Sequence, residues 1–367
     1  MSNWSRTIDI LNKEETTRRI PVMVYLSIVF VIGTVGNMLV ILVYFGSLWK
    51  LKGAHWTFIR AIAVTDTLAC ILIIPYEFYQ QTHQLTFYSE WTCKCFRTTS
   101  VHITITSCLL LVIMSVNRLY KVCRPTKAQL SPRQAYVSIF SLEIVAALLS
   151  WPQVVNSGIN LVQLENNITG YDCSFALTSM DKKHATIYSG VLFLGFLVCI
   201  SALITIYGLI GHILRKRDTF KSKRMSVYRV TRSVVSVTTH KSTDLGDGTS
   251  DSENDMGEVN NSTTPYKTTS CKKQGSRRLT KIAFSISLCF VVSYLPSLVG
   301  TLTSVFSKDQ TVTNNWTPAV IPISSRLFLI NNIINAWLYY WLDKTFRSKV
   351  KKISSKLLLS KWRKVEL

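Results

Sequence analysis

Seven stretches of the 367-residue sequence are long and apolar enough to cross a lipid bilayer as helices. A helix rises about 1.5 Å per residue, so roughly 20 apolar residues span a hydrocarbon core of about 30 Å. The fourth stretch is the weakest, because Glu143 lies in its middle. The sequence therefore predicts an all-α membrane protein, a seven-transmembrane helix bundle with spans at 21–45, 57–80, 94–122, 135–155, 185–214, 279–305 and 318–341.

The positive charge of the chain is confined to the segments between the apolar runs. A formal net charge of +22 would also suit a nucleic-acid-binding protein. However, the basic residues form no stripe interleaved with aromatic residues, and only 17% of residues are charged, against about 25% in soluble domains. Basic residues beside apolar runs are typical of the cytoplasmic flanks of spans, so we expect the lipid bilayer as a partner and no nucleic acid.

The distribution of basic residues also predicts the orientation of the spans. Lysine and arginine gather after the first, third, fifth and seventh spans, whereas the loop 81–92 has neither and 305–317 has only Lys308. Basic residues are retained on the cytoplasmic side. We therefore expect a multi-pass plasma-membrane protein with an extracellular N-terminus and a cytoplasmic C-terminus. Glycosylation motifs on the segments assigned to the outside agree with this orientation, at Asn3, Asn167 and Asn315.

The segments outside the spans differ in composition. Residues 1–20 are polar and contain no cleavable signal peptide, so we expect an extracellular tail there. Residues 215–276 are rich in Ser, Thr and charge. We expect this cytoplasmic loop to be largely disordered, with its ends extending the fifth and sixth helices by a turn or two. The predicted organisation is a tail at 1–20, helices one to five at 21–214, the loop at 215–276, helices six and seven at 277–341, and a C-terminal region at 342–367.

The C-terminal region has an amphipathic pattern. Phe346, Val350, Ile353 and Leu357 recur at spacings of four, three and four residues, and basic residues fill the other faces. This pattern is typical of a helix that lies on the anionic inner leaflet, with a solvated basic tail as the alternative. Serines here and in the long loop are candidate phosphorylation sites.

Short motifs recur in a fixed order along the predicted spans. They are Gly36-Asn37, Ala63-Val-Thr-Asp66, Trp91 before Cys93, Asn117-Arg118-Leu119-Tyr120, Tyr207, Phe290-x-x-Ser293-Tyr294-x-Pro296 and Asn335-Ala336-Trp-Leu-Tyr339. In this order and spacing, the motifs resemble those of the rhodopsin-like (class A) G-protein-coupled receptors. The sequence resembles a divergent member, because Asn117 replaces an Asp, Tyr294 a Trp, and Cys199 and Ala336 replace prolines of the family pattern.

The resemblance implies a seven-helix bundle with a short amphipathic eighth helix that binds an extracellular ligand. It also implies heterotrimeric G protein, arrestin and receptor kinases as partners. The kink that Pro296 introduces into the sixth helix would act as a pivot, although a static bend is the alternative. The resemblance places G-protein coupling at Asn117, Arg118, Tyr120, Tyr207 and Tyr339, and the activation switch at Phe290, Tyr294, Pro296 and Asn335.

A disulfide is expected on the outer side. Cys93 and Cys173 both fall where the compartment is oxidising, and two thiols placed there usually pair. The resemblance pairs the same two positions, which ties the second outer loop to the third helix. The remaining cysteines are expected to be core fillers, lipid-facing residues or reduced thiols, at 70, 95, 108, 123, 199, 271 and 289.

Asp66 is an acid in the middle of a span, which is costly in hydrocarbon and points to a functional site. By resemblance, its neighbours are the oxygen-bearing side chains of Ser107, Asn331, Asn332 and Asn335. A hard cation prefers such ligands, so we expect a sodium ion here and no other cofactor. The alternative is a protonated Asp66 in a water-filled hydrogen-bond cluster.

The resting restraint of the family is altered at Arg118. In the family that the sequence resembles, the preceding acid restrains this arginine in the resting state, but here Asn117 carries no charge. Ser276 stands near the position where some members have an acid on the sixth helix, so the second ionic restraint is also missing. We therefore expect raised ligand-independent signalling.

The outer pocket implied by the resemblance favours a peptide ligand. Ser100 stands where amine receptors place an Asp, and the seventh span has no Lys for a retinal Schiff base. The loop 160–176 alternates apolar and polar residues around Asn166, Asn167 and Gly170, which predicts a β-hairpin lid. Such a lid over charged residues is commoner among peptide receptors. The expected pocket residues are Glu77, Gln81, Arg97, Ser100, Val101, Thr104, Tyr188, Tyr294, Ser297 and Arg326.

Two other classes of membrane protein remain as alternatives. A transporter would need a polar path with ionisable groups at several depths, and apart from Asp66 and Glu143 the span interiors are apolar. A ligand-independent or heteromer-forming scaffold would explain the altered motifs. No nucleophile–base pair, metal-ligand cluster or phosphate loop points to an enzyme.

Overall fold

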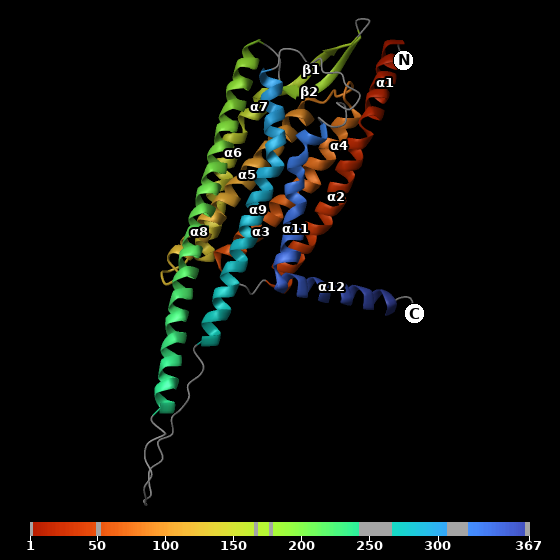
Figure 1. Ribbon diagram of the computed structural model, residues 1–367. Coiled ribbons are helices and arrows are strands. Elements are labelled where there is room, and N and C mark those ends of the chain that lie inside the picture. The colour runs from red at the N-terminus through yellow and green to blue at the C-terminus, as the bar shows by residue number, and fades with distance from the viewer. Residues whose placement is uncertain are drawn as a thin grey trace, which may run out of the picture.

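The described part of the chain folds into a bundle of long helices with one β-hairpin at its end (Figure 1). In this computed structural model the described residues are 3–48, 53–164, 168–175, 179–241, 266–306 and 322–363. The elements are α1 (Asn3–Arg18), α2 (Ile20–Ile41), η1 (Leu42–Ser47), α3 (Ala54–Leu68), η2 (Ala69–Ile73), α4 (Ile74–Thr82), α5 (Glu90–Cys123), α6 (Pro132–Ser150), α7 (Pro152–Asn156), β1 (Ser157–Gln163), β2 (Thr169–Phe175), α8 (Ser179–Lys241), α9 (Tyr266–Phe306), η4 (Leu327–Leu329), α11 (Ile330–Leu342) and α12 (Lys344–Arg363).

The predicted spans correspond closely to these helices. Within the described residues, six segments are long and apolar enough to cross a membrane: Ile20–Gly46, Ala54–Thr82, Glu90–Cys123, Pro132–Asn156, Lys183–Arg217 and Thr280–Gly300. The seventh predicted span, 318–341, is described from residue 322 onward and ends in α11. The chain is therefore a multi-pass membrane protein with the helix order of a seven-helix bundle.

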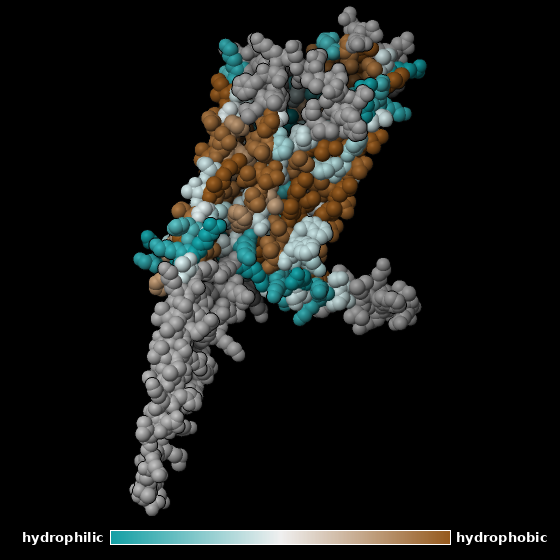
Figure 2. Space-filling view, viewed as in Figure 1, coloured by the Kyte–Doolittle hydropathy of each residue, from teal (hydrophilic) through white to brown (hydrophobic). Residues whose placement is uncertain are grey.

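Large hydrophobic side chains cover the outside of the bundle between its two ends (Figure 2). Leu148, Val198 and Ile204 are each more than 60% exposed. Soluble monomers rarely expose such a continuous apolar surface. Hydrophilic residues gather at the two ends instead, as expected for a bundle whose middle faces lipid.

The two ends of the bundle differ in structure. β1 and β2 form an antiparallel hairpin that pairs Ser157 with Phe175 and Gln163 with Thr169, in agreement with the predicted hairpin. The N-terminus lies at this end, which we call the hairpin end (Figure 1). α12 leaves the bundle at the opposite end, the α12 end.

The helices tolerate prolines and wide turns without ending. The second span continues through the π-helical turn η2, and Pro75 falls in the first turn of α4. α9 remains helical through Pro296, the position of the expected kink. A proline in a membrane helix is tolerated because local adjustment and neighbouring groups satisfy the freed carbonyl.

The fourth span accommodates Glu143 through contacts with α5. His102 Nε2 lies 3.2 Å from Glu143 Oε2, and Thr106 Oγ1 donates to the same oxygen at 3.2 Å. The span begins at a capping box in which Ser131 and Gln134 each bond to the other's backbone. Glu143 therefore has polar partners on the neighbouring helix, which removes the main objection to a fourth span.

Two segments are more helical than we expected. The predicted tail 1–20 contains α1, whose Asn12 side chain donates to the carbonyl of Thr82 at 2.9 Å and accepts from the amide of Leu85 at 3.0 Å. α8 continues to Lys241, far beyond the predicted turn or two, and its part 215–241 contains neither Gly nor Pro to interrupt it. The two helices that border the loop 215–276 therefore extend farther into it than we expected, over 215–241 and 266–276, and 242–265 lies outside the described residues.

Candidate functional site

A cavity of about 590 Å³ lies among the helices in the half of the bundle nearer the hairpin end. This volume falls within the range of small-molecule and cofactor sites in proteins. The cavity is bordered by α4, α5, α8 and α9, and by Leu149 of α6, Gln153 of α7 and Phe328 of η4. Seven of the predicted pocket residues line it: Glu77, Arg97, Ser100, Val101, Thr104, Tyr294 and Ser297.

Three of the expected pocket residues lie elsewhere. Gln81 is fully buried and accepts a hydrogen bond from Arg19 at 3.1 Å, which joins the second span to the start of the first. Tyr188 donates its hydroxyl to the carbonyl of Leu149 at 2.9 Å, so it ties α8 to α6. Arg326 binds the cavity residue Glu77 at 2.7 Å without lining the cavity itself.

The Glu77–Arg326 ion pair sets the charge of one wall. Both side chains are about 15% exposed or less, so the carboxylate charge of Glu77 is neutralised within the protein. A largely desolvated, hydrogen-bonded pair of this kind is sensitive to the loss of either member. The pair connects the second span to the segment before α11.

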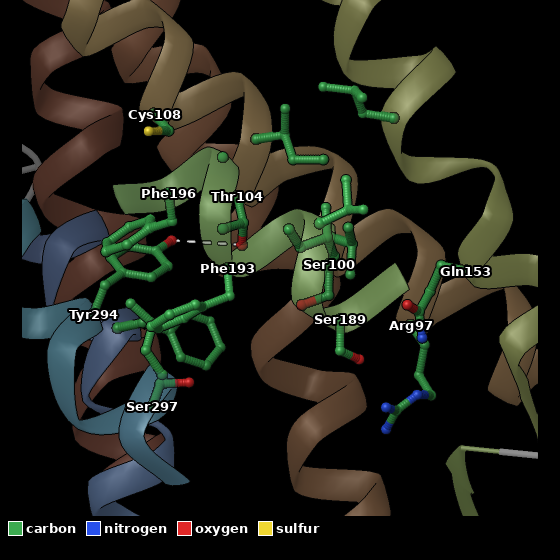
Figure 3. Close-up of a pocket in the computed structure, with 18 of the residues that line it drawn as sticks. Arg97, Ser100, Thr104, Cys108, Gln153, Ser189, Phe193, Phe196, Tyr294 and Ser297 are labelled. Carbon is green, nitrogen blue, oxygen red and sulfur yellow. Dashed lines mark hydrogen bonds between the residues drawn. The ribbon is translucent and has the colours of Figure 1, made fainter. Parts of the chain in front are cut away.

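Arg97 joins the cavity to the hairpin. Its Nε donates to Ser157 Oγ at 3.3 Å, and Gln153 donates to the same oxygen at 2.7 Å. Burial raises the pKa of Asp172 on β2, and the positive charge of Arg97 opposes that rise. Figure 3 shows Arg97 and Gln153 together at one end of the cavity, with Tyr294 at the other.

Aromatic rings form the cavity wall around Tyr294. The Tyr294 ring lies 4.4 Å from Phe290, 5.7 Å from Phe196 and 5.5 Å from Phe328, between ring centroids. Its hydroxyl donates to Thr104 at 3.5 Å (Figure 3). The expected switch residues Phe290 and Tyr294 are therefore in contact, and Tyr294 reaches α5.

Several residues that line the cavity were not predicted from the sequence. Phe193 and Phe196 belong to the long apolar run of the fifth span, in which a cavity-facing residue has the same hydropathy as a lipid-facing one. Their orientation depends on the rotation of α8 about its axis, which hydropathy does not specify. Other lining residues that were not predicted include Gln153 of α7, Leu298 of α9 and Phe328 of η4.

The disulfide expected between Cys93 and Cys173 is present, with a Cα–Cα distance of 5.6 Å. Both cysteines are buried, and they connect α5 to β2. The bond holds the hairpin against the cavity end of α5. Of the three expected glycosylation sites, Asn167 and Asn315 lie outside the described residues, and only the backbone of Asn3 is described, at the start of α1.

A polar cluster lies in the middle of the bundle around Asp66. Asn335 donates to the Asp66 carboxylate at 2.6 Å, and Asp66, Ser107 and Asn331 are all buried. Within the described residues, the side-chain oxygens of Asn331 and Asn335 have no hydrogen-bond partner. The amide of Asn37 donates to the carbonyl of Asn332 at 2.5 Å. The cluster thus presents a carboxylate and two unpaired buried oxygens, a donor set that suits a hard cation.

Arg118 lies buried toward the α12 end, only 1% exposed. In the part of the chain that is described, none of its three guanidinium nitrogens has a hydrogen-bond partner. Nearby, Tyr207 accepts from Ser115 at 2.8 Å and lies 3.2 Å from Ser287, so one hydroxyl joins α5, α8 and α9. Among the other expected coupling residues, Tyr339 is buried, Asn117 is half-buried and Tyr120 is exposed.

An ion pair that we did not predict lies at the same end. Arg278 of α9 binds the carboxylate of Asp343, which follows α11 and is fully buried. Tyr44 donates to the other oxygen of this carboxylate at 3.2 Å. The two ionic restraints considered from the sequence involve Arg118, whereas this contact uses neither Arg118 nor α5.

Comparisons with known proteins agree with this architecture. The sequence pattern of the family described as "7 transmembrane receptor (rhodopsin family)" matches residues 36–339. The chain is 25% identical to neuropeptide receptor npr-1 of Caenorhabditis elegans, over 90% of this chain and 72% of that protein. It is 22% identical to neuromedin-U receptor 2 of Mus musculus, over 92% of this chain and 75% of the relative. It is also 24% identical to type-1 angiotensin II receptor A of Xenopus laevis, over 59% of each chain.

Proposed function

Because the chain belongs to the rhodopsin family of seven-transmembrane receptors, we propose that it binds an extracellular peptide and activates heterotrimeric G proteins. The cavity behind the hairpin is the observation that carries this proposal. It combines two charged residues, Glu77 and Arg97, with the aromatic wall around Tyr294. A peptide offers polar backbone and apolar side chains to both kinds of surface.

The ligand class is supported by the chemistry of the cavity. Ser100 lines the cavity and has no charge to pair with a ligand ammonium, which disfavours a monoamine. The relatives include proteins named as neuropeptide, neuromedin-U and angiotensin II receptors. Both considerations favour a peptide.

The proposed orientation places the hairpin end outside the cell and the α12 end in the cytoplasm of a plasma-membrane protein. Basic residues support it, because Lys121 lies in the last turn of α5 and Arg124 and Lys127 follow that helix, at the α12 end. Such residues are retained on the cytoplasmic side of membranes. In this orientation arrestin and receptor kinases meet the Ser- and Thr-containing segments beyond α8 and α11.

Signal transfer would follow the contacts between α5, α8 and α9. A ligand that moves Tyr294 acts directly on Phe290, which lies one turn nearer the α12 end of α9. Tyr207 and Ser287 link α8 to α9 nearer the α12 end, where Arg118 has no hydrogen-bond partner among the described residues. Movement of α9 there would open Arg118 to a G protein.

A sodium ion is proposed at the Asp66 cluster. The Asp66 carboxylate and the oxygens of Ser107, Asn331 and Asn335 would hold it, and the two asparagine oxygens are unpaired within the described residues. The ion would supply a positive charge that neutralises the buried carboxylate. Asn335 lies on α11 and Asp66 on α3, so binding would hold these two helices together.

A ligand-independent or heteromer-forming scaffold is the alternative function. The observation that favours it is that Arg118 has no hydrogen-bond partner in the described part of the chain and follows Asn117, which departs from the family pattern. Such a scaffold does not need the charged cavity residues Glu77 and Arg97. Substituting these residues would therefore impair a peptide receptor but not a ligand-independent scaffold.

The test is G-protein activation in cells exposed to a peptide library. We expect at least one peptide to activate, and Arg97→Gln to weaken its response about tenfold or more, as loss of about 1.4 kcal/mol would do. Lys94→Gln is the matched control, because Lys94 lies on the same helix but pairs with exposed Glu90. Activation by no peptide, or equal responses in both variants, would overturn the proposal for this cavity.

A further inference from the structure

Two free thiols from different helices meet in the wall of the cavity. Cys108 lies on α5 and Cys199 on α8, and the two side chains are close enough to interact across the cavity wall that both of them line. Neither belongs to a disulfide, and both line the cavity. The sequence alone assigned these cysteines to filling or reduced-thiol roles, and their direct contact was not foreseen.

The pair lies at the deep end of the cavity. Cys108 is 11 residues beyond Arg97 on α5, which places it about 16 Å farther along the helix axis. Figure 3 shows Cys108 on the same side of the cavity as Phe196 and Tyr294, away from Arg97. A solute small enough to pass the cavity would therefore reach both sulfurs.

The two thiols differ in exposure. Cys108 is 5% exposed, whereas Cys199 is half-buried. Oxidation of cysteine depends on access and on thiolate character. Cys199 is thus placed to react first, with Cys108 beside it as the resolving thiol.

We propose that Cys108 and Cys199 form an oxidisable dithiol site, which hydrogen peroxide converts to a disulfide between α5 and α8. The Cys199 sulfur attacks one peroxide oxygen, the O–O bond breaks, and the thiol proton leaves with the second oxygen as water. The resulting sulfenic acid is attacked by the Cys108 sulfur, an S–S bond forms, and the S–O bond breaks with release of a second water. Two electrons pass from the sulfurs to the peroxide.

The disulfide would act on the residues around the proposed switch. Phe196 precedes Cys199 by one helical turn and lies 5.7 Å from the rings of both Phe290 and Tyr294. A covalent bond at Cys199 would hold α8 against α5 beside these rings. It would also fix the wall of the cavity that a ligand must contact.

The test uses the full chain in lipid nanodiscs, without any ligand or G protein. After treatment with hydrogen peroxide, free thiols are alkylated and the protein is digested for mass spectrometry. We expect a linked Cys108–Cys199 peptide and a parallel loss of alkylation at both positions. Absence of this peptide while exposed Cys95 or Cys123 is oxidised would overturn the proposal, as would linkage of either thiol to a different cysteine.

Variants give an independent readout. Peroxide should raise the unfolding temperature of the wild-type protein, because a cross-link restricts the unfolded chain. C108S and C199S should each abolish the rise, whereas C289S, a half-buried thiol on α9, should retain it. An equal rise in C199S would place the effect elsewhere and overturn the proposal. Because no ligand or transducer is needed, failure here leaves the proposed receptor function untouched.

Discussion

Arg278 and Asp343 form an ion pair that ties α9 to the junction of α11 and α12. The Asp343 carboxylate is fully buried, and it also accepts from the backbone amides of Thr345 at 2.8 Å and Phe346 at 3.2 Å. Tyr44 completes the set from the first span. The acid therefore caps α12 and restrains α9 at once.

Loss of this ion pair should raise ligand-independent signalling. Arg278→Gln frees the α12 end of α9, while Asp343 keeps Tyr44 and its backbone donors. We expect basal G-protein activation to rise about fivefold or more, which corresponds to a coupling of about 1 kcal/mol. The measurement is nucleotide exchange at matched surface expression, with Lys281→Gln, exposed one turn along α9, as the control. Unchanged basal signalling in Arg278→Gln would show that the pair does not restrain α9.

Asn117→Asp should lower basal signalling. The substitution places a carboxylate beside Arg118, whose guanidinium has no hydrogen-bond partner among the described residues. A charge-assisted bond to this arginine would stabilise the resting arrangement. The same cell assay measures the effect, with Asn117→Leu as a control that adds no charge. If Asn117→Asp left basal G-protein activation at the wild-type level, the missing charge at position 117 would not be the cause of raised basal signalling.

The parts of the fold that depend on local pattern were predictable. Span length and hydropathy located the six described spans, and the alternation in 160–176 located the hairpin. The extent of α8 was not predicted, because Ser, Thr and charge in 215–241 indicate disorder by composition, while the absence of Gly and Pro leaves a helix intact.

Contacts between distant helices could not be predicted in the same way. Glu143 and His102 are 41 residues apart, and Arg278 and Asp343 are 65 apart. Each contact requires a particular rotation of two helices about their axes, and a uniformly apolar span carries little information about rotation. The Cys93–Cys173 bond was predictable despite its separation of 80 residues, because few cysteines share the outer side.

The His102–Glu143 contact predicts a non-additive effect on stability. Replacing His102 with Leu leaves Glu143 bonded to Thr106, and replacing Glu143 with Leu leaves His102 bonded to Ser150, so each single variant keeps a polar side chain that has lost one of its two contacts. Replacing both residues removes the two polar groups together. Each single substitution should cost about 0.6–2 kcal/mol, the range for polar contacts between membrane helices. Thermal unfolding of the two single variants and the double variant in nanodiscs measures the coupling. Additive losses in the double variant would mean that the two side chains do not interact.

Sodium should stabilise the protein through Asp66. Among the described residues, the side-chain oxygens of Asn331 and Asn335 have no hydrogen-bond partner, and together with the buried Asp66 carboxylate they offer oxygen ligands to a cation. Raising sodium chloride should therefore increase the unfolding temperature more than choline chloride does at equal ionic strength. Asp66→Asn should remove this difference while keeping a side chain that can bond to Asn335. Asn37→Ala is the control, because Asn37 donates to a backbone carbonyl near the cluster and supplies no carboxylate. An equal response to the two salts in the wild-type protein would favour a protonated Asp66 with no bound ion.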